Sequence, residues 1–155
     1  MATTVSAATM TVTVTESITL NGTQQGSTNT LSVASIKEVF KRIVRCPASN
    51  TTTLAVFNST VHGAAGAIDL EDAKYIRITN KDDTNELELA MVAGSTNYTI
   101  ALRAGESHVL GTPDNLMLVD DDSGTPSFGV MIDLASIQAN PGGNVIDVEV
   151  FIAST

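Results

Sequence analysis

The sequence predicts an all-β fold, an antiparallel β-sandwich of the jelly-roll kind. Strand-like segments recur at intervals of about ten residues, and Gly, Asn, Asp or Pro marks the turns between them. Thr is abundant, aromatic residues make up only 4% of the chain and Trp is absent, which favours strands packed through aliphatic side chains. The 155 residues fit one domain, whose core needs no disulfide or metal.

Eight of the nine predicted strands lie after residue 50. In chain order they are 10–20, 54–57, 75–80, 86–92, 97–102, 107–110, 116–119, 128–134 and 145–152. In the first, the even-numbered apolar residues from Met10 to Leu20 share one face and threonines occupy the other, so we expect one buried face. In the last, Ile146, Val148, Val150 and Ile152 form an unbroken apolar face, which predicts a central strand.

Two turns are clear from the sequence. Asn21-Gly22 suits a tight reversal because both residues tolerate positive φ. The stretch YIRITNKDDTNELEL, residues 75–89, alternates apolar and polar side chains on both sides of a polar segment at 81–85. This pattern predicts a β-hairpin.

The segment 35–45 fits two structures. Ser35 and Glu38 form a capping box, and the apolar residues from Ile36 to Val44 have the spacing of an amphipathic helix. As a strand, the same segment has apolar residues on both faces, so it would need burial on both sides. The β-branched content and the stop at Cys46-Pro47 favour the strand, and the fold has at most one short helix, near 35–45.

For domain organisation we expect a flexible N-terminal arm over residues 1–9 and a single sandwich domain over residues 10–155. The polar segment 23–30 is also expected to be mobile in the isolated chain. Such segments become ordered along the sheet edge of a partner, which supplies backbone hydrogen bonds without a large apolar patch.

Charge and termini restrict the partners. A net charge of −9 argues against nucleic acid and anionic membranes as partners, because phosphate groups are bound by clustered cations. The one basic cluster, Lys37, Lys41, Arg42 and Arg45, is interpreted as a solvated face. The N-terminus has neither a signal sequence nor a transmembrane segment, so we expect synthesis in a cytoplasm. The single Cys46 is expected to be a buried free thiol.

Reactive chemistry is sparse. His62 and His108 are interpreted as solvated loop residues, and no motif of a hydrolase, zinc protease or phosphate-binding loop occurs. The acidic stretches at 120–122 and 80–83 lack the ligand alternation of a calcium loop, so turn formation is the preferred interpretation. We therefore expect no enzyme, and no catalytic, cofactor-binding or metal-binding residues.

One part of the sequence resembles a known group of proteins. Residues 75–110, YIRITNKDDTNELELAMVAGSTNYTIALRAGESHVL, are similar to a recurrent module of small structural proteins of tailed bacteriophages, especially those of marine and cyanobacterial hosts. The module has a YIRITN strand, a D-x-T-N turn, an apolar strand and a Gly-Glu turn before a short strand. The opening residues 16–22, ESITLNG, share this character.

The resemblance implies a virion structural protein made in the host cytoplasm. The expected role is a capsid decoration or cement protein, which binds the outer surface of the major capsid protein shell as a homo-oligomer, with a trimer preferred. The alternative is a β-sandwich protein of the tail, neck or fibre that acts in tail assembly or host recognition. Neither role implies a cofactor, a nucleic-acid partner or a membrane.

Overall fold

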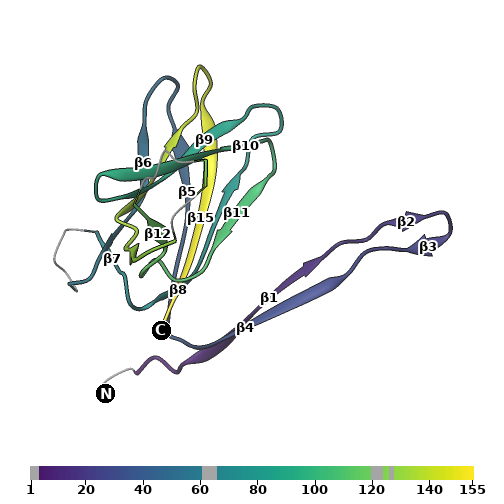
Figure 1. The fold of residues 1–155 in the computed structure, drawn as a ribbon, viewed down its shortest axis with the longest axis horizontal. Helices are drawn as coiled ribbons and strands as arrows, with labels where there is room; N and C mark the ends of the chain where they lie inside the picture. The colour runs from purple at the N-terminus through teal and green to yellow at the C-terminus, as the bar shows by residue number, and fades with distance from the viewer. Residues whose placement is uncertain (1–3, 61–65, 120–123, 126–127) are drawn as a thin grey trace.

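The computed structural model describes residues 4–60, 66–119, 124–125 and 128–155. Across these residues the chain consists of strands, turns and connecting loops, without a helix. The prediction of an all-β fold is confirmed. No helix in this part of the chain is long and apolar enough to cross a membrane. Figure 1 shows two parts: a sandwich of two sheets, and a long hairpin that leaves the sandwich close to the C-terminus.

The sandwich consists of two facing sheets. One has the strand order β11-β8-β15-β5, and the other has the order β10-β9-β14-β6-β7. The strands are β5 (Glu38–Cys46), β6 (Thr52–Asn58), β7 (Ile68–Asp69), β8 (Ala73–Asn80), β9 (Leu87–Ala93), β10 (Thr96–Leu102), β11 (Ser107–Leu110), β14 (Ser136–Asn140) and β15 (Ile146–Ser154). A small ribbon of β12 (Met117–Leu118) and β13 (Met131–Ile132) lies in the connection between β11 and β14.

The order of these strands is that of a jelly roll. Apart from the short β7, which pairs in parallel with β6, successive strands alternate between the two sheets, and only β9 and β10 are joined within one sheet as a hairpin. This alternation is the double Greek key of the jelly-roll fold, as the sequence predicted. The strand β15 pairs with β5 on one side and β8 on the other, so its predicted central position is confirmed.

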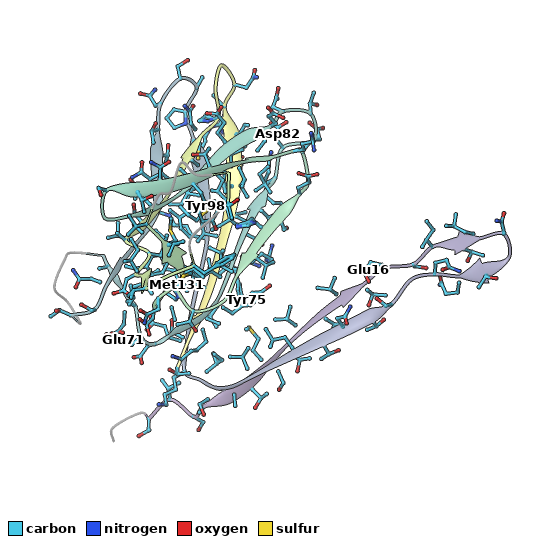
Figure 2. The ribbon with its side chains drawn as sticks, viewed as in Figure 1. Glu16, Glu71, Tyr75, Asp82, Tyr98 and Met131 are labelled. Carbon is cyan, nitrogen blue, oxygen red and sulfur yellow. The ribbon has the colours of Figure 1, made fainter. Side chains whose placement is uncertain are left out.

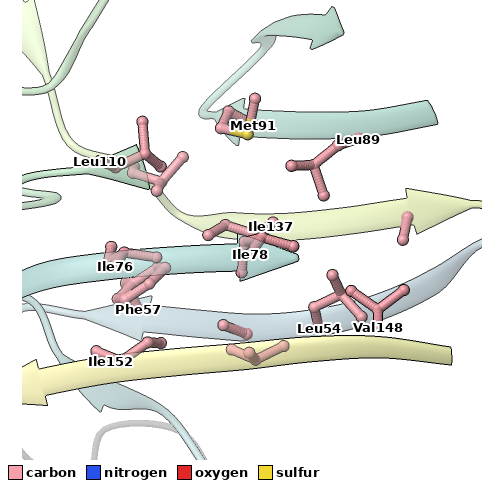
Figure 3. Packing of buried hydrophobic residues seen from close by; sticks show 14 of the residues in the cluster. Leu54, Phe57, Ile76, Ile78, Leu89, Met91, Leu110, Ile137, Val148 and Ile152 are labelled. Carbon is pink, nitrogen blue, oxygen red and sulfur yellow. The ribbon is translucent and has the colours of Figure 1, made fainter. Parts of the chain in front are cut away.

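The core fills the space between the sheets (Figure 3). Ile76 and Ile78 of β8, Leu89 of β9, Ile137 of β14 and Val148 of β15 are among the fully buried side chains. Complete burial of such a side chain contributes ~2 kcal/mol. The aliphatic composition of the chain therefore accounts for the core.

The stretch 75–89 is not a hairpin, in contrast to the prediction. β8 pairs with β11 and β15, whereas β9 pairs with β10 and β14 in the opposite sheet. The polar segment between them therefore crosses from one sheet to the other. The alternation of apolar and polar residues is the same in a hairpin and in such a crossing, because both bury one face of each strand.

The prediction also misplaced one strand near residue 130. Phe128 and Val130 are exposed, and only Met131–Ile132 of the segment 128–134 is a strand. The sheet strand is instead Ser136–Asn140, which buries Ile137 and Ala139 and lies between β6 and β9. With only two apolar inward residues, this strand has a weak pattern in the sequence.

The segment 35–45 is extended, which confirms the favoured strand. β5 covers Glu38–Cys46 and pairs along its whole length with β15. Phe40, Val44 and Cys46 face the core, but Val39 and Ile43 on the other face are 51% and 60% exposed. The expectation that such a strand must be buried on both sides is therefore wrong.

The N-terminal part of the chain is organised differently from our expectation of a flexible segment 1–9 and a sandwich from residue 10. Strand structure begins at Ala8, and residues 8–36 form a hairpin outside the two sandwich sheets. The segment 23–30, expected to be mobile, supplies part of the returning half of this hairpin. We call residues 8–36 the arm; Figure 1 shows it projecting away from the sandwich.

Candidate functional site

The arm is a two-stranded antiparallel ribbon with one apolar and one polar face. It consists of β1 (Ala8–Thr15), β2 (Thr19–Leu20), β3 (Thr23–Gln24) and β4 (Thr28–Ile36). Cross-strand partners share a face, and the register places Met10 opposite Val33 and Val12 opposite Leu31. Thr11, Thr13 and Thr15 lie opposite Ser32, Thr30 and Thr28 on the other face.

The tip of the arm is closed by the predicted reversal at Asn21-Gly22. Both residues have positive φ, 50° and 77°, between the paired strands β2 and β3. Gly26 is required nearby for a different reason: a Cβ at this position would lie 1.9 Å from the backbone oxygen of Glu16. The two halves of the arm therefore approach each other too closely at Gly26 for any side chain.

The base of the arm packs on the outer face of the β11-β8-β15-β5 sheet. Tyr75, Ile36 and Ala153 form a small buried cluster there, and Met10, Val12, Val33 and Phe151 pack against it. The rings of Tyr75 and Phe151 meet edge to face, with centroids 6.1 Å apart. The backbone N–H of Lys37 donates to the carbonyl of Ser154 at 2.9 Å. The arm is thus anchored at its base to the sandwich.

A charged pair lies on the same sheet face. The guanidinium of Arg77 is 5.8 Å from the centre of the Phe151 ring, and its Nη2 donates to Oε1 of Glu149 at 2.5 Å. Arg77 also donates to the hydroxyl of Thr79. The hydrogen bond from Arg77 is the main reason that the pKa of Glu149 is lowered. These contacts fix Arg77 beside the base of the arm.

Beyond its base the arm separates from the sheet. A cleft of about 300 Å³ opens between the two, lined by Met10, Thr11, Val12, Thr13, Tyr75, Arg77 and Phe151. Figure 2 shows the arm continuing past Glu16 to its tip, away from the sandwich. Val14, Ile18, Leu20 and Leu31 in this outer part are between 48% and 55% exposed. We call these four residues the outer apolar set.

The outer apolar set contradicts the expectation that segment 10–20 has one buried face. Only Met10 and Val12 of that face are partly buried. A two-stranded hairpin is marginally stable in water unless a third layer covers it. The sandwich supplies this layer at the base of the arm but not along its outer part. The arm therefore presents an apolar surface suited to contact with another molecule.

A second uncovered surface lies on the sheet that anchors the arm. β5 is an edge strand, since β15 is its one partner among the strands that the structure describes. Its outward residues alternate Val39, Lys41, Ile43 and Arg45, which we call the β5 strip. The basic cluster seen in the sequence lies on this strand or just before it, and its side chains are exposed as expected. Cations on an edge strand also discourage unspecific strand pairing.

The described residues among those considered for chemistry, His108 and Cys46, lie on different strands. His62 and residues 120–122 lie outside the described residues. His108 is not a solvated loop residue but a partly buried member of β11, in edge-to-face contact with Tyr98. Cys46 is fully buried, and burial raises the pKa of its thiol. Within the described ranges, no cluster of three or more His, Cys, Asp or Glu could hold a metal ion.

The acidic turn at 80–83 has a structural role. Oδ1 of Asp82 accepts hydrogen bonds from the backbone N–H groups of Thr84 and Asn85 at 2.8 and 2.7 Å. These bonds, that of Asn85 first, lower the pKa of Asp82. The fully buried Asn80 donates to the carbonyls of Asn85 and Leu102. This network holds the chain where it crosses between the sheets. The interpretation of residues 80–83 as a turn agrees with this role.

A cavity of about 340 Å³ lies beside the C-terminal strand, lined by Glu38, Asp69, Asp72 and Thr155 among others. Oδ1 of Asp69 accepts hydrogen bonds from the backbone N–H groups of Glu71 and Asp72, so this carboxylate shapes a local turn. The arm and the β5 strip expose apolar residues along paired strands, whereas the exposed Phe128 and Val130 lie in a loop.

Comparison with known proteins yields no relative: no family model, no curated protein and no solved structure matches this chain.

Proposed function

We propose that this chain is a structural protein of a tailed-bacteriophage virion, namely a capsid decoration or cement protein on the outer surface of the major capsid protein shell. The observation that carries the proposal is the arm, an uncharged ribbon apart from Glu16, which projects from a rigid sandwich and presents the outer apolar set. An element of this shape serves attachment and has no evident catalytic use.

Three further properties support this role. The resemblance of residues 75–110 to a module of phage structural proteins suggests the context. The net charge of −9 suits an outer position, away from packaged DNA, and limits aggregation before assembly. The jelly roll provides a rigid body whose only extended projection among the described residues is the arm. A fold alone does not define a function, so the arm and the resemblance carry the argument.

The test is the abundance and position of the protein in purified virions. Quantitative mass spectrometry should give a copy number comparable with that of the major capsid protein, and antibody labelling should mark the capsid. A much lower copy number with labelling at the tail would assign the protein to the tail or neck instead. Absence from virions would refute a structural role altogether.

The arm can be tested in the same system. Replacing residues 17–26 with Asn-Gly shortens it while keeping a two-residue turn between Glu16 and Ser27, whose backbones are hydrogen-bonded at 2.9 Å. We expect the shortened protein to fold but to compete poorly with the full chain for capsids that lack it. Equal occupancy would show that the sandwich, not the arm, makes the attachment.

A further inference from the structure

Two strand surfaces of the described residues expose apolar side chains: the outer apolar set on the arm and Val39 and Ile43 of the β5 strip on the sandwich. We propose that the arm of one copy lies against the β5 strip of a second copy, so that the protein forms a closed oligomer by exchanging arms. This inference rests on the proposed function only in taking the arm as an element of assembly.

The contact at the base of the arm shows the chemistry of such an interface. There, the apolar arm face covers Tyr75 and Phe151 on the outer face of the sheet. The β5 strip belongs to the same outer face, because Val39 lies in register with Ala153 and Lys41 with Phe151. The surface that binds the base of the arm thus continues, uncovered, onto β5. A second arm would find the same kind of apolar surface there.

The arm of the same chain does not cover the strip. The arm precedes β5 directly in the chain, separated from it by Lys37 alone, and its tip projects away from the sandwich. Val39 and Ile43 are 51% and 60% exposed, so the arm of the same chain leaves both of them uncovered. Another copy can bury both surfaces at once.

Charge also favours a second copy. Copies with a net charge of −9 repel each other, and an interface between them needs a surface without negative charge. The arm carries one charged side chain, Glu16, while the β5 strip carries two cations, Lys41 and Arg45, of which Lys41 lies 3.7 Å from Glu149. Glu16 is exposed and its Oε2 accepts a hydrogen bond from the hydroxyl of Ser27, so its carboxylate is available to a cation of the strip.

One contact between an arm and a β5 strip is too small to be stable alone, so the copies must exchange arms reciprocally or in a ring. The outer part of the arm is a ribbon ~30 Å long and ~10 Å wide, so docking it buries ~600 Å² summed over the two surfaces. Stable interfaces bury ~1,200 Å² or more, which a single arm does not reach. Reciprocal exchange between two copies doubles the area, and a ring gives every copy two such contacts.

The first experiment compares self-association of matched variants of the full chain by sedimentation. Val14→Thr with Leu31→Thr changes the arm, Val39→Thr with Ile43→Thr changes the strip, and Val56→Thr with Val145→Thr is the control at exposed residues elsewhere. Thr keeps the strand propensity. We expect association at least about tenfold weaker for the arm and strip variants, and unchanged for the control. Circular dichroism checks that each variant is folded.

The second experiment detects the contact itself. Protein with Leu31→Cys is mixed with protein carrying Ile43→Cys and oxidised, and each is also oxidised alone; Cys46 stays buried in both. We expect a disulfide-linked dimer chiefly in the mixture, with the bond joining the two introduced cysteines. Equal yields with and without mixing would overturn the proposed pairing.

The outcomes separate this inference from the proposed function. A protein that is monomeric at every concentration, or whose arm and strip variants associate like the control, refutes arm exchange even if it is abundant on capsids. Exchange of arms by a protein that is absent from virions would refute the proposed function and leave the interface established.

Discussion

Tyr98 and His108 meet across one open side of the sandwich, where the hydroxyl of Tyr98 lies 3.4 Å from Nε2 of His108. Their rings are edge to face, with centroids 6.4 Å apart. Tyr98 belongs to β10 and His108 to β11, the outermost strands of the two sheets on that side. The pair therefore links two sheets at an edge where β10 and β11 are not paired with each other in the described part of the chain.

Burial lowers the pKa of His108 below its ordinary value of 6.5, so the folded state prefers the neutral ring. As the pH falls below 6.5, the unfolded chain binds a proton first, and stability is lost as the pH passes through the lowered pKa. We expect His108→Phe to lose less stability than the wild type between about pH 7.5 and about pH 5.5, measured by urea unfolding. Identical losses in the two proteins would contradict this role.

The buried amide of Asn80 should be essential to the crossing between the sheets. It donates to the carbonyls of Asn85 and Leu102, both at 2.9 Å, and accepts from the N–H of Asp82. Asn80→Ala leaves these groups without their partner, so we expect a loss of about 2–3 kcal/mol in the free energy of unfolding. Asn97→Ala, at an exposed position on β10, is the control and should change little.

Gly26→Ala should disorder the arm without unfolding the sandwich. The added Cβ would overlap the backbone of Glu16, whereas Gly111→Ala, the control, meets no atom within 4 Å. We expect thermolysin to cut the arm of the Gly26 variant rapidly, with the melting temperature of the sandwich nearly unchanged. A resistant arm would show that the two strands can separate enough to accept a methyl group.

Removing the charge of Arg77 should raise the pKa of Glu149. Arg77 provides the hydrogen bond that chiefly lowers this pKa, while Lys41, 60% exposed and 3.7 Å from the carboxylate, contributes less. In a nuclear magnetic resonance titration, Arg77→Met should therefore shift the Glu149 pKa towards 4.5 more than Lys41→Met does. Because the folded pKa is lowered, the stability from this pair is present above pH 4.5 and is lost on acidification.

Cys46 should be inert in the folded protein. Its side chain is fully buried and its thiol pKa is raised above 9.0 by burial, so both access and thiolate formation are restricted. We expect a disulfide reagent such as Ellman's reagent to react with the protein only on unfolding, in step with the urea transition. Fast reaction in native buffer would indicate local opening at the end of β5.

Individual strands were predictable where one face is unambiguously apolar. Ile146, Val148, Val150 and Ile152 indicated a central strand because a central position buries such a face fully, and β15 has this position. The weak strand containing Ile137 and Ala139 was missed, since two apolar residues do not distinguish a strand from a loop. Phe128 and Val130 suggested a strand because they are apolar, but both are exposed and lie outside the strands.

The arm shows the same limit at the level of the candidate site. Met10, Val12 and Val14 have one alternating pattern, but the structure covers the first two and leaves the third exposed. The pattern sets which side chains share a face, and the distance from the sandwich sets whether that face is covered. The exposed apolar pair Val39 and Ile43 could likewise be recognised only once β5 was placed at a sheet edge.

The sequence by itself determined the all-β class, the tight turn at Asn21-Gly22, the buried Cys46 and the facial alternation of its clear strands, because these depend on local propensity and period. Only the tertiary structure decided that Ile78 and Leu89 lie in opposite sheets and that residues 8–36 leave the sandwich as an arm. Strand pairing is made between residues distant in the chain, and alternation with a period of two is compatible with many partners.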